Sequence, residues 1–167
     1  MNLKTEAAAL VARAKRLNAI GRTASRDDLK ALDTALSGKY PSWLAELVAT
    51  MPLWGLELGW QAYEPSADAD GMEWLELCDA KGIVSESVEC YPGLAILPEG
   101  YVNVGSCTGG SGNPYFISIH DGGDPPLYRI FHDVSDDPSI ILVEGRETVA
   151  SSLSEFFHCA IPSPRSP

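Results

Sequence analysis

The stretch between residues 101 and 143 constrains the fold more than any other part of the chain. Short runs rich in Val, Ile, Tyr and Phe alternate there with clusters of Gly, Pro, Asn and Asp. Such runs favour a pleated, half-buried surface, and the clusters favour turns. Because the connections are only about six or seven residues long, they leave no room for a crossover helix. The pattern predicts four antiparallel strands, at 101–107, 115–120, 127–132 and 139–143.

Helical periodicity dominates the first 51 residues. Leucines at helical spacing predict a helix over 3–20 with Gly21 as its left-handed cap. Ser25 is a typical N-cap for a second helix, which ends at Gly38, and Tyr40-Pro41 opens a third that stops at Met51-Pro52. These helices cannot form a sheet of their own, so they are expected to cover the sheet that follows.

The remaining segments complete an α+β fold. Alternation over 56–60 predicts another strand, 72–79 fits either a strand or a helical turn, and 83–90 predicts a short helix. Ser152 and Glu155 have the spacing of a capping box, which predicts one C-terminal helix. The expected fold class is an antiparallel sheet of at least four strands with N-terminal helices and one C-terminal helix.

The length of 167 residues indicates one main domain. We expect an N-terminal helical extension over 1–39 packed on an α+β domain over 40–161, followed by a disordered tail over 162–167. No run of 18 apolar residues exists, so no membrane contact is expected. The opening residues are broken by charges at Lys4, Glu6 and Arg13 and do not match a secretory signal, which predicts a cytoplasmic protein.

The charge is divided unevenly along the chain, whose formal net charge is −11. Residues 1–39 contain eight Lys/Arg and four Asp/Glu, whereas residues 40–167 contain four Lys/Arg and 19 Asp/Glu. So acidic a body repels phosphate and disfavours nucleic acid as a partner. It favours a basic protein partner, although acidity also serves plain solubility.

Acidic side chains gather in the predicted turns, where binding residues commonly lie. We expect partner contacts from Glu64, Asp68, Asp70, Asp121, Asp124, Asp133, Asp136 and Asp137. The run at 64–71 has a superficial likeness to a calcium loop. However, it offers only Asp68 and Asp70 at suitable spacing and lacks the Glu that closes an EF-hand loop. No metal site is predicted there.

The glycine-rich stretch at 105–114 does not predict phosphate binding. It lacks the Gly-Lys-Ser/Thr ending of a P-loop and connects two strands rather than a strand and a helix. We interpret it as a wide hairpin turn in which Gly109, Gly110 and Gly112 supply positive φ angles.

Two His-Asp pairs, at His120 and His132, are candidates for metal binding or base catalysis. With residue 120 opposite about 128 and 132 opposite about 116, the histidines would lie on the order of 13 Å apart, too far for one metal ion. The cysteines at 78, 90, 107 and 159 form no CxxC pair, so free thiols and no cofactor are expected. A hydrolase site near Cys107, His120 and His132 stays open as the less favoured alternative.

Several short motifs together resemble the SUKH superfamily. They are Leu97-Pro98, the glycine-rich hairpin from Gly105 to Tyr115, YFISIH, LYRIFHD and SLSEFF, with YPSWLAEL, PLWG and YPG upstream. The resemblance covers about residues 40–161 and implies a non-enzymatic α+β protein-binding module. In bacteria such modules often act as immunity proteins that occlude a toxin, frequently a basic nuclease. The yeast cell-wall assembly regulator also belongs to this superfamily, so a regulatory scaffold is the alternative.

Overall fold

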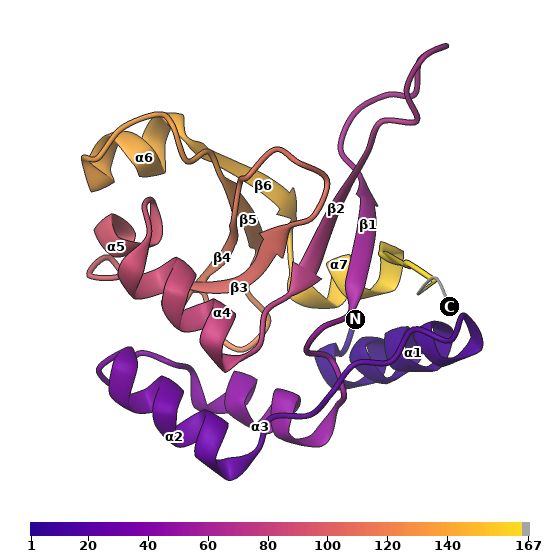
Figure 1. Cartoon of the computed structure of the whole chain (residues 1–167), viewed down its shortest axis with the longest axis horizontal. Coiled ribbons are helices and arrows are strands. Elements are labelled where there is room, and N and C mark those ends of the chain that lie inside the picture. The colour runs from indigo at the N-terminus through magenta and orange to yellow at the C-terminus, as the bar shows by residue number, and fades with distance from the viewer. Residues whose placement is uncertain (165–167) are drawn as a thin grey trace.

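The structure is a computed structural model that describes residues 1–164, and Figure 1 shows the order of its elements. The elements are α1 (Leu3–Arg16), α2 (Arg26–Ala35), α3 (Ser42–Thr50), β1 (Glu57–Gln61), β2 (Met72–Leu77), α4 (Ala80–Val84), the π-helical turn η1 (Ser85–Glu89), α5 (Gly93–Ile96), β3 (Tyr101–Cys107), β4 (Tyr115–Ser118), β5 (Leu127–Ile130), α6 (Pro138–Glu144), β6 (Arg146–Ala150), α7 (Leu153–Cys159) and β7 (Ile161–Pro162).

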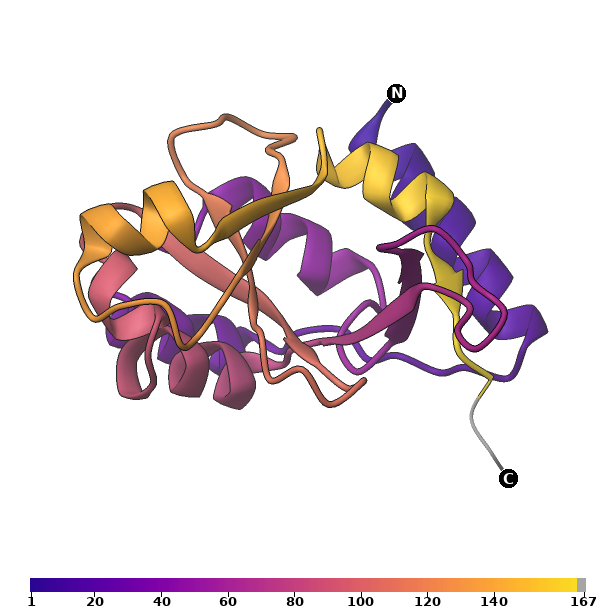
Figure 2. The same cartoon turned by 90° about the horizontal axis from the view of Figure 1, so that it is seen from above.

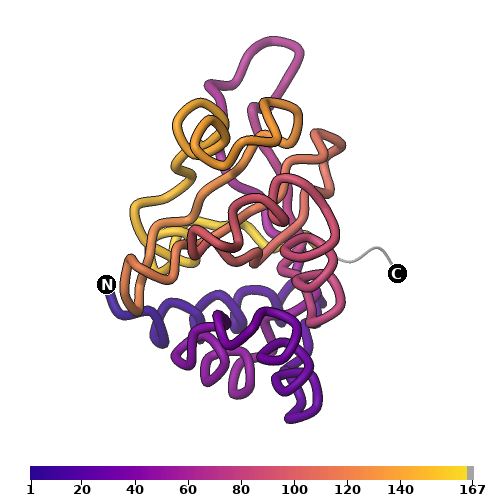
Figure 3. Tube along the Cα trace, turned by 90° about the vertical axis from the view of Figure 1, so that its left-hand side faces the viewer, coloured from indigo at the N-terminus to yellow at the C-terminus, as the bar shows by residue number. Residues whose placement is uncertain are grey.

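One curled antiparallel sheet forms the centre of the molecule (Figures 1 and 2). Its strand order is β6-β5-β4-β3-β2-β1-β7, and every neighbouring pair is antiparallel. The predicted α+β class is therefore confirmed. Helices α1, α2 and α3 form a layer beneath the sheet, which is clearest in Figure 3.

The predicted strands at 101–107, 115–120 and 127–132 are confirmed as β3, β4 and β5, the last two slightly shorter than predicted. The alternation at 56–60 belongs to β1, and 72–79 contains the strand β2. The register between β4 and β5 differs from the expected one, because Tyr115 lies opposite Arg129 and Phe116 opposite Tyr128. This shift of four residues moves the two histidines further apart along the ladder, and the connection between β4 and β5, residues 119–126, is longer than the predicted 121–126.

The predicted strand at 139–143 is wrong, because this segment is the helix α6. Asp137 is its N-cap, and its carboxylate accepts hydrogen bonds from the backbone N–H groups of Ser139 and Ile140. Pro138 occupies the first helical turn, where its missing N–H has no cost. These start signals override the short apolar run, whose periodicity alone cannot distinguish a helix from a strand. The fourth strand of the meander is β6, which follows α6.

Alternating side chains of the sheet fill two hydrophobic cores. On one face Val102, Tyr115 and Ile117 join the main core with α1, α2, α3, α4 and α7. On the other face Phe116 and Ile130 pack with helices α5 and α6 through Ile96 and Ile141. Because side chains of a strand alternate between faces, both faces of β4 can be covered by helices.

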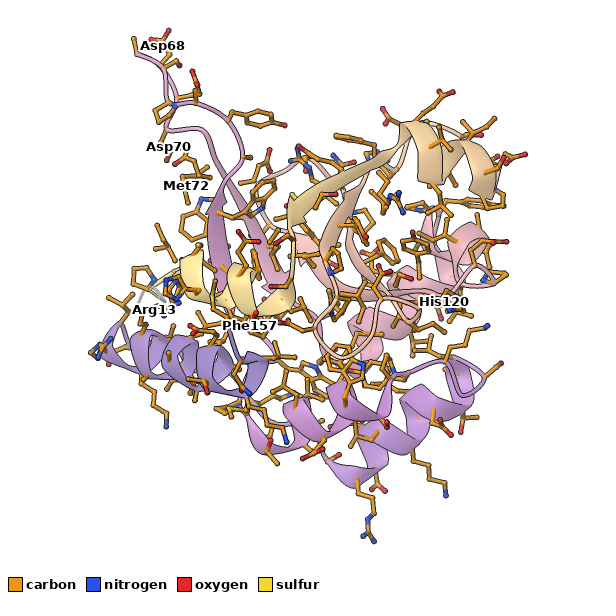
Figure 4. All side chains as sticks on the ribbon, turned by 180° about the vertical axis from the view of Figure 1, so that it is seen from behind. Arg13, Asp68, Asp70, Met72, His120 and Phe157 are labelled. Atoms are coloured by element: carbon orange, nitrogen blue, oxygen red, sulfur yellow. The ribbon has the colours of Figure 1, made fainter. Side chains whose placement is uncertain are left out.

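The N-terminal helix α1 is part of the main core. It lies beside α7 in Figures 1 and 2, with Ala7 and Leu10 completely buried. The guanidinium of Arg13 donates to the carbonyl oxygens of Phe157 and Ala160 at the end of α7, and Figure 4 places Arg13 close to Phe157. Residues 1–39 are thus joined to the end of the chain by both packing and hydrogen bonds.

The ends of two predicted segments differ from expectation. Helix α1 stops at Arg16, and Asn18 takes the left-handed conformation with φ 56°, whereas Gly21 does not. Asn is the residue after Gly that best tolerates this conformation. The disordered tail predicted over 162–167 is wrong at its start, because Pro162 pairs with Leu58 in β7 and the backbone N–H of Ser163 donates to the carbonyl oxygen of Glu57. Residues 165–167 of that tail lie outside the described residues.

The buried Arg129 bonds to residues from both sides of the curled sheet. The side chain of Arg129 on β5 is 1% exposed, and its Nη2 lies 2.6 Å from a carboxylate oxygen of Glu147 on β6. The same guanidinium forms an ion pair with Glu73 of β2, whose Oε1 lies 3.4 Å from Nη1, and its Nη2 donates to the hydroxyl of Tyr63 at 2.8 Å. Burial alone would lower the pKa of Arg129, but the bonds to Tyr63 and Glu147 raise it above its usual value. The arginine therefore stays charged inside the fold.

Aromatic rings surround the same guanidinium. Its central carbon lies 5.2 Å from the ring centroid of Trp60 and 5.2 Å from that of Phe131. Cations are attracted to aromatic faces at such distances. Trp60 also donates from Nε1 to the hydroxyl of Tyr115 at 3.1 Å. The cluster joins β1 and β2 to β4, β5 and β6 across the interior of the sheet.

Replacing Gly110 with valine should lower the free energy of unfolding by about 1–2 kcal/mol. Gly110 has φ 94° and Gly112 has φ 72°, which confirms that this hairpin uses positive φ, and an added Cβ at Gly110 would meet no atom within 4 Å. The loss would therefore come from the backbone conformation alone. Urea unfolding measures it, with Gly109→Val as the control, because Gly109 lacks a positive φ. Equal losses for both variants would contradict the explanation.

Candidate protein-binding surface

The three acidic loops do not form one site. The loop at 64–70 is the tip of the β1–β2 hairpin, which projects from the body, and Figure 4 shows Asp68 and Asp70 far from His120. The loop at 121–124 connects β4 to β5, and the loop at 133–137 follows β5. These two loops therefore lie beyond opposite ends of β5. The eight predicted contact residues cannot all meet one small partner surface.

Four of the eight carboxylates are engaged in hydrogen bonds within the chain. Asp124 accepts hydrogen bonds from the backbone N–H and the hydroxyl of Ser154 at 2.8 and 2.6 Å, and it thereby caps the start of α7. The hydroxyl and N–H of Ser139, with the N–H of Ile140, hold the pKa of Asp137 below its usual value. Asp70 accepts from the N–H of Met72, and Asp121 accepts from the hydroxyl of Tyr128. These hydrogen bonds within the fold account for the positions of the four carboxylates.

The other four carboxylates face solvent. Within residues 1–164, no hydrogen bond or ion pair involves Glu64, Asp68, Asp133 or Asp136, and all four are exposed. Two of them belong to the hairpin tip and two to the loop before α6. The charges available to a partner therefore lie in two separate regions.

One of these regions contains an exposed apolar surface, which we call the α5–α6 face. Helices α5 and α6 contact each other and cover the sheet (Figure 1), while several of their outward side chains remain in solvent. The exposed apolar side chains of this face are Tyr91 (47%), Leu94 (44%), Ile140 (39%) and Val143 (81%). Single exposed apolar residues are normal, but several on adjacent helices commonly mark an interaction site.

The charge around the α5–α6 face is mostly negative, and the exposed Arg146, just after α6, is a cation that packs on Tyr101 and Tyr128 of the core beneath. Segments 89–99 and 132–144 contain six carboxylates and no Lys or Arg. The acidic residues are Glu89, Glu99, Asp133, Asp136, Asp137 and Glu144. An apolar centre with a charged rim is the usual composition of a protein interface. Sequence reasoning found three of these carboxylates but missed the apolar centre, because Ile140 and Val143 were assigned to a strand.

No family model, curated protein or solved structure matches this chain. The resemblance to the SUKH superfamily therefore remains an expectation from the motifs. In the part of the chain that the structure describes, no helix has the length and apolarity needed to cross a bilayer. No group of three or more metal-binding side chains is present within residues 1–164.

The two histidines lie at opposite ends of the sheet. His120 packs against Gly100, which immediately precedes β3, whereas Cys107 ends that strand. The ring Nδ1 of His132 is 2.9 Å from Oδ1 of Asn113, and the ring lies against Gly112. The structure thus brings His132 to the loop that follows Cys107 and leaves His120 about a full strand length away.

The thiol of Cys107 sits in the curve of the glycine-rich loop. The hydroxyl of Ser111 donates to Sγ at 3.0 Å. Burial alone would raise the pKa of this thiol, but the Ser111 hydroxyl and the N–H groups of Gly112, Ser111 and Gly109 bring the pKa below its usual value. Within residues 1–164 no hydrogen bond joins Cys107 to His132. The polar groups around this sulfur explain a hairpin turn and do not assemble a nucleophile with its base.

Proposed function

We propose that this chain is a non-enzymatic protein-binding module whose α5–α6 face docks a basic protein. The observation that carries the proposal is the pairing of four exposed apolar side chains with six carboxylates, against one arginine, Arg146, at the end of α6. The apolar side chains exclude water at the centre of an interface, where most binding energy arises. The carboxylates at the rim speed the encounter with a basic surface.

The biological role that fits this surface best is that of an immunity protein that neutralises a toxin by occlusion. A nuclease must present a basic surface, because it binds the phosphates of nucleic acid. A face that offers carboxylates around an apolar centre can cover such a surface and exclude the substrate. The SUKH resemblance supports the same role. A regulatory scaffold is the alternative, and it would use the same face without abolishing an activity.

Replacing Val143 with glutamate should weaken partner binding at least about tenfold, or ~1.4 kcal/mol, because it places a charge among the exposed apolar side chains. The measurement is affinity capture from lysate of the cells that express the protein, followed by titration of the captured basic protein. The matched control is Ile20→Glu, because Ile20 is 70% exposed but lies in the connection between α1 and α2. Equal binding by both variants would contradict the proposed face.

A second measurement separates the two biological roles. The captured protein is expressed in a test strain with and without this chain. Restored growth with the wild type, and no restoration with Val143→Glu, is expected for an immunity protein. Binding with unchanged growth would contradict immunity and favour the scaffold. Capture of an acidic partner would contradict the charge argument on which both roles depend.

A further inference from the structure

Two strand edges of the curled sheet lack a neighbour along part of their length. β6 is the last strand on one side of the sheet. On the other side β7 pairs only with Leu58 and Gly59 of β1. To continue the pairing, Ala160 would have to lie opposite Trp60. Instead, the backbone N–H of Ala160 donates to the carbonyl oxygen of Phe156 at the end of α7. Trp60 and Gln61 therefore lie on an open backbone edge, and open edges are templates for an added strand.

A groove connects these two open edges. Its sides are formed by Trp60 and Gln61 of β1, Met72 of β2, and Val149 and Ala150 of β6, and α7 contributes Cys159. The groove encloses about 220 Å³. Pockets for small molecules and cofactors usually measure roughly 300–1,000 Å³. The groove is smaller than a usual cofactor pocket, and the open backbone edges beside it can bond an extended peptide.

Charge identifies the kind of peptide that would fit. The hairpin segment 55–78, which forms one side of the groove and projects beyond it (Figure 1), contains six carboxylates and no Lys or Arg. Two of these carboxylates, on Glu64 and Asp68, are exposed and unbonded among the described residues. A second copy of this chain, with its net charge of −11, would be repelled from such an edge. A basic peptide would be attracted.

We propose that an extended, basic segment of another protein inserts in this groove as an added strand on the outer edge of β6. Its backbone would bond to the free N–H and C=O groups of residues 146–150. Alternate side chains of a strand point to opposite faces, so small apolar ones would enter the groove against Met72 and Val149. The Lys or Arg side chains between them would lie toward the hairpin carboxylates.

The test uses an acetylated, amidated hexapeptide in which lysine and valine alternate. Two-dimensional NMR of the full chain follows the backbone amides during titration. We expect saturable shifts at Thr148, Val149, Ala150 and Trp60, with a dissociation constant of ~1 mM or lower. The same peptide N-methylated at alternate residues should bind at least tenfold more weakly, because it cannot complete the strand hydrogen bonds. A glutamate–valine peptide should not bind.

Two variants sharpen the interpretation. Glu64→Lys with Asp68→Lys should weaken binding and reduce its salt dependence, while Val143→Glu on the α5–α6 face should leave it unchanged. Equal affinity for the N-methylated peptide, or shifts confined to α5 and α6, would overturn the proposal. Dimerisation of the free protein in sedimentation, together with NMR shifts of its β6 amides that depend on protein concentration, would also overturn it, because the occupant would then be a second copy.

Discussion

Replacing Arg129 with methionine should lower the free energy of unfolding by about 3–5 kcal/mol. The change removes the only charge that faces Glu73 and Glu147 inside the sheet among the described residues, and leaves both carboxylates partly buried without a partner. It also removes a guanidinium that packs on Trp60 and Phe131. Chemical unfolding followed by tryptophan fluorescence measures the loss.

Arg22→Met is the matched control for this prediction. Arg22 is paired with Asp28 and Asp79, but its side chain is 48% exposed, and exposed ion pairs contribute about 1 kcal/mol or less. Adding Glu147→Gln to Arg129→Met should recover part of the loss, because a neutral amide is cheaper to bury than an unpaired carboxylate. If Arg129→Met and Arg22→Met had similar effects, the buried cluster would not join the two sides of the sheet.

Leu10→Ala should destabilise the whole molecule by about 2–5 kcal/mol. Leu10 is 0% exposed in the main core, on the face of α1 that packs against α7. The substitution leaves a cavity between the first and last helices, and such cavities collapse only partly. A single cooperative unfolding transition, shifted to lower urea, is the expected result. It would show that residues 1–39 belong to the same folding unit as the sheet.

The comparison for this prediction is Leu17→Ala. Leu17 is 41% exposed just after the end of α1, and surface substitutions usually change stability by about 0.5 kcal/mol or less. The prediction would be contradicted if Leu10→Ala removed or shifted a separate, early unfolding transition while the main transition stayed unchanged. It would show instead that α1 unfolds independently and that residues 1–39 form an extension attached to a complete domain.

Local sequence signals were sufficient for much of the fold. Ser25 and Ser152 were identified as N-caps from residue type and spacing, and both caps are present. Of the three glycines to which the wide hairpin turn assigned positive φ, Gly110 and Gly112 have it, whereas the prediction for Gly109 is wrong. These features depend on a few neighbouring residues, so the sequence contains all the information that they require.

Features that depend on distant residues could not be predicted in the same way. The apolar run at 139–143 is compatible with a strand or a helix, and the decisive Asp137-Pro138 start signal was overlooked. β6 was missed because Arg146 and Thr148 make it look like a polar loop. Arg129 gave no sign of burial, since a charged residue in a strand normally faces solvent. Its partners come from β2, β6 and the residues after β1, and only the folded topology brings them together.

For the same reason, the acidic loops of the candidate surface were predicted, but its apolar centre was missed. The acidic loops were visible as clusters of Asp in turns, but which carboxylates are engaged depends on contacts such as that between Asp124 and Ser154, 30 residues away. The apolar centre of the α5–α6 face arises because α5 and α6, separated by β3, β4 and β5 in the chain, meet on the same side of the sheet.

The packing of α1 on α7 has a consequence for biosynthesis. The apolar side of α1 is synthesised well before α7, the helix that packs against it, which ends at Cys159. At translation rates of about 5–20 residues per second, on the order of 10 s pass between the synthesis of Leu10 and that of α7, against which it packs. During that interval the nascent chain presents an amphipathic helix and an unfinished core to solvent. Chaperones that bind exposed apolar segments during synthesis therefore have an opportunity to bind at α1.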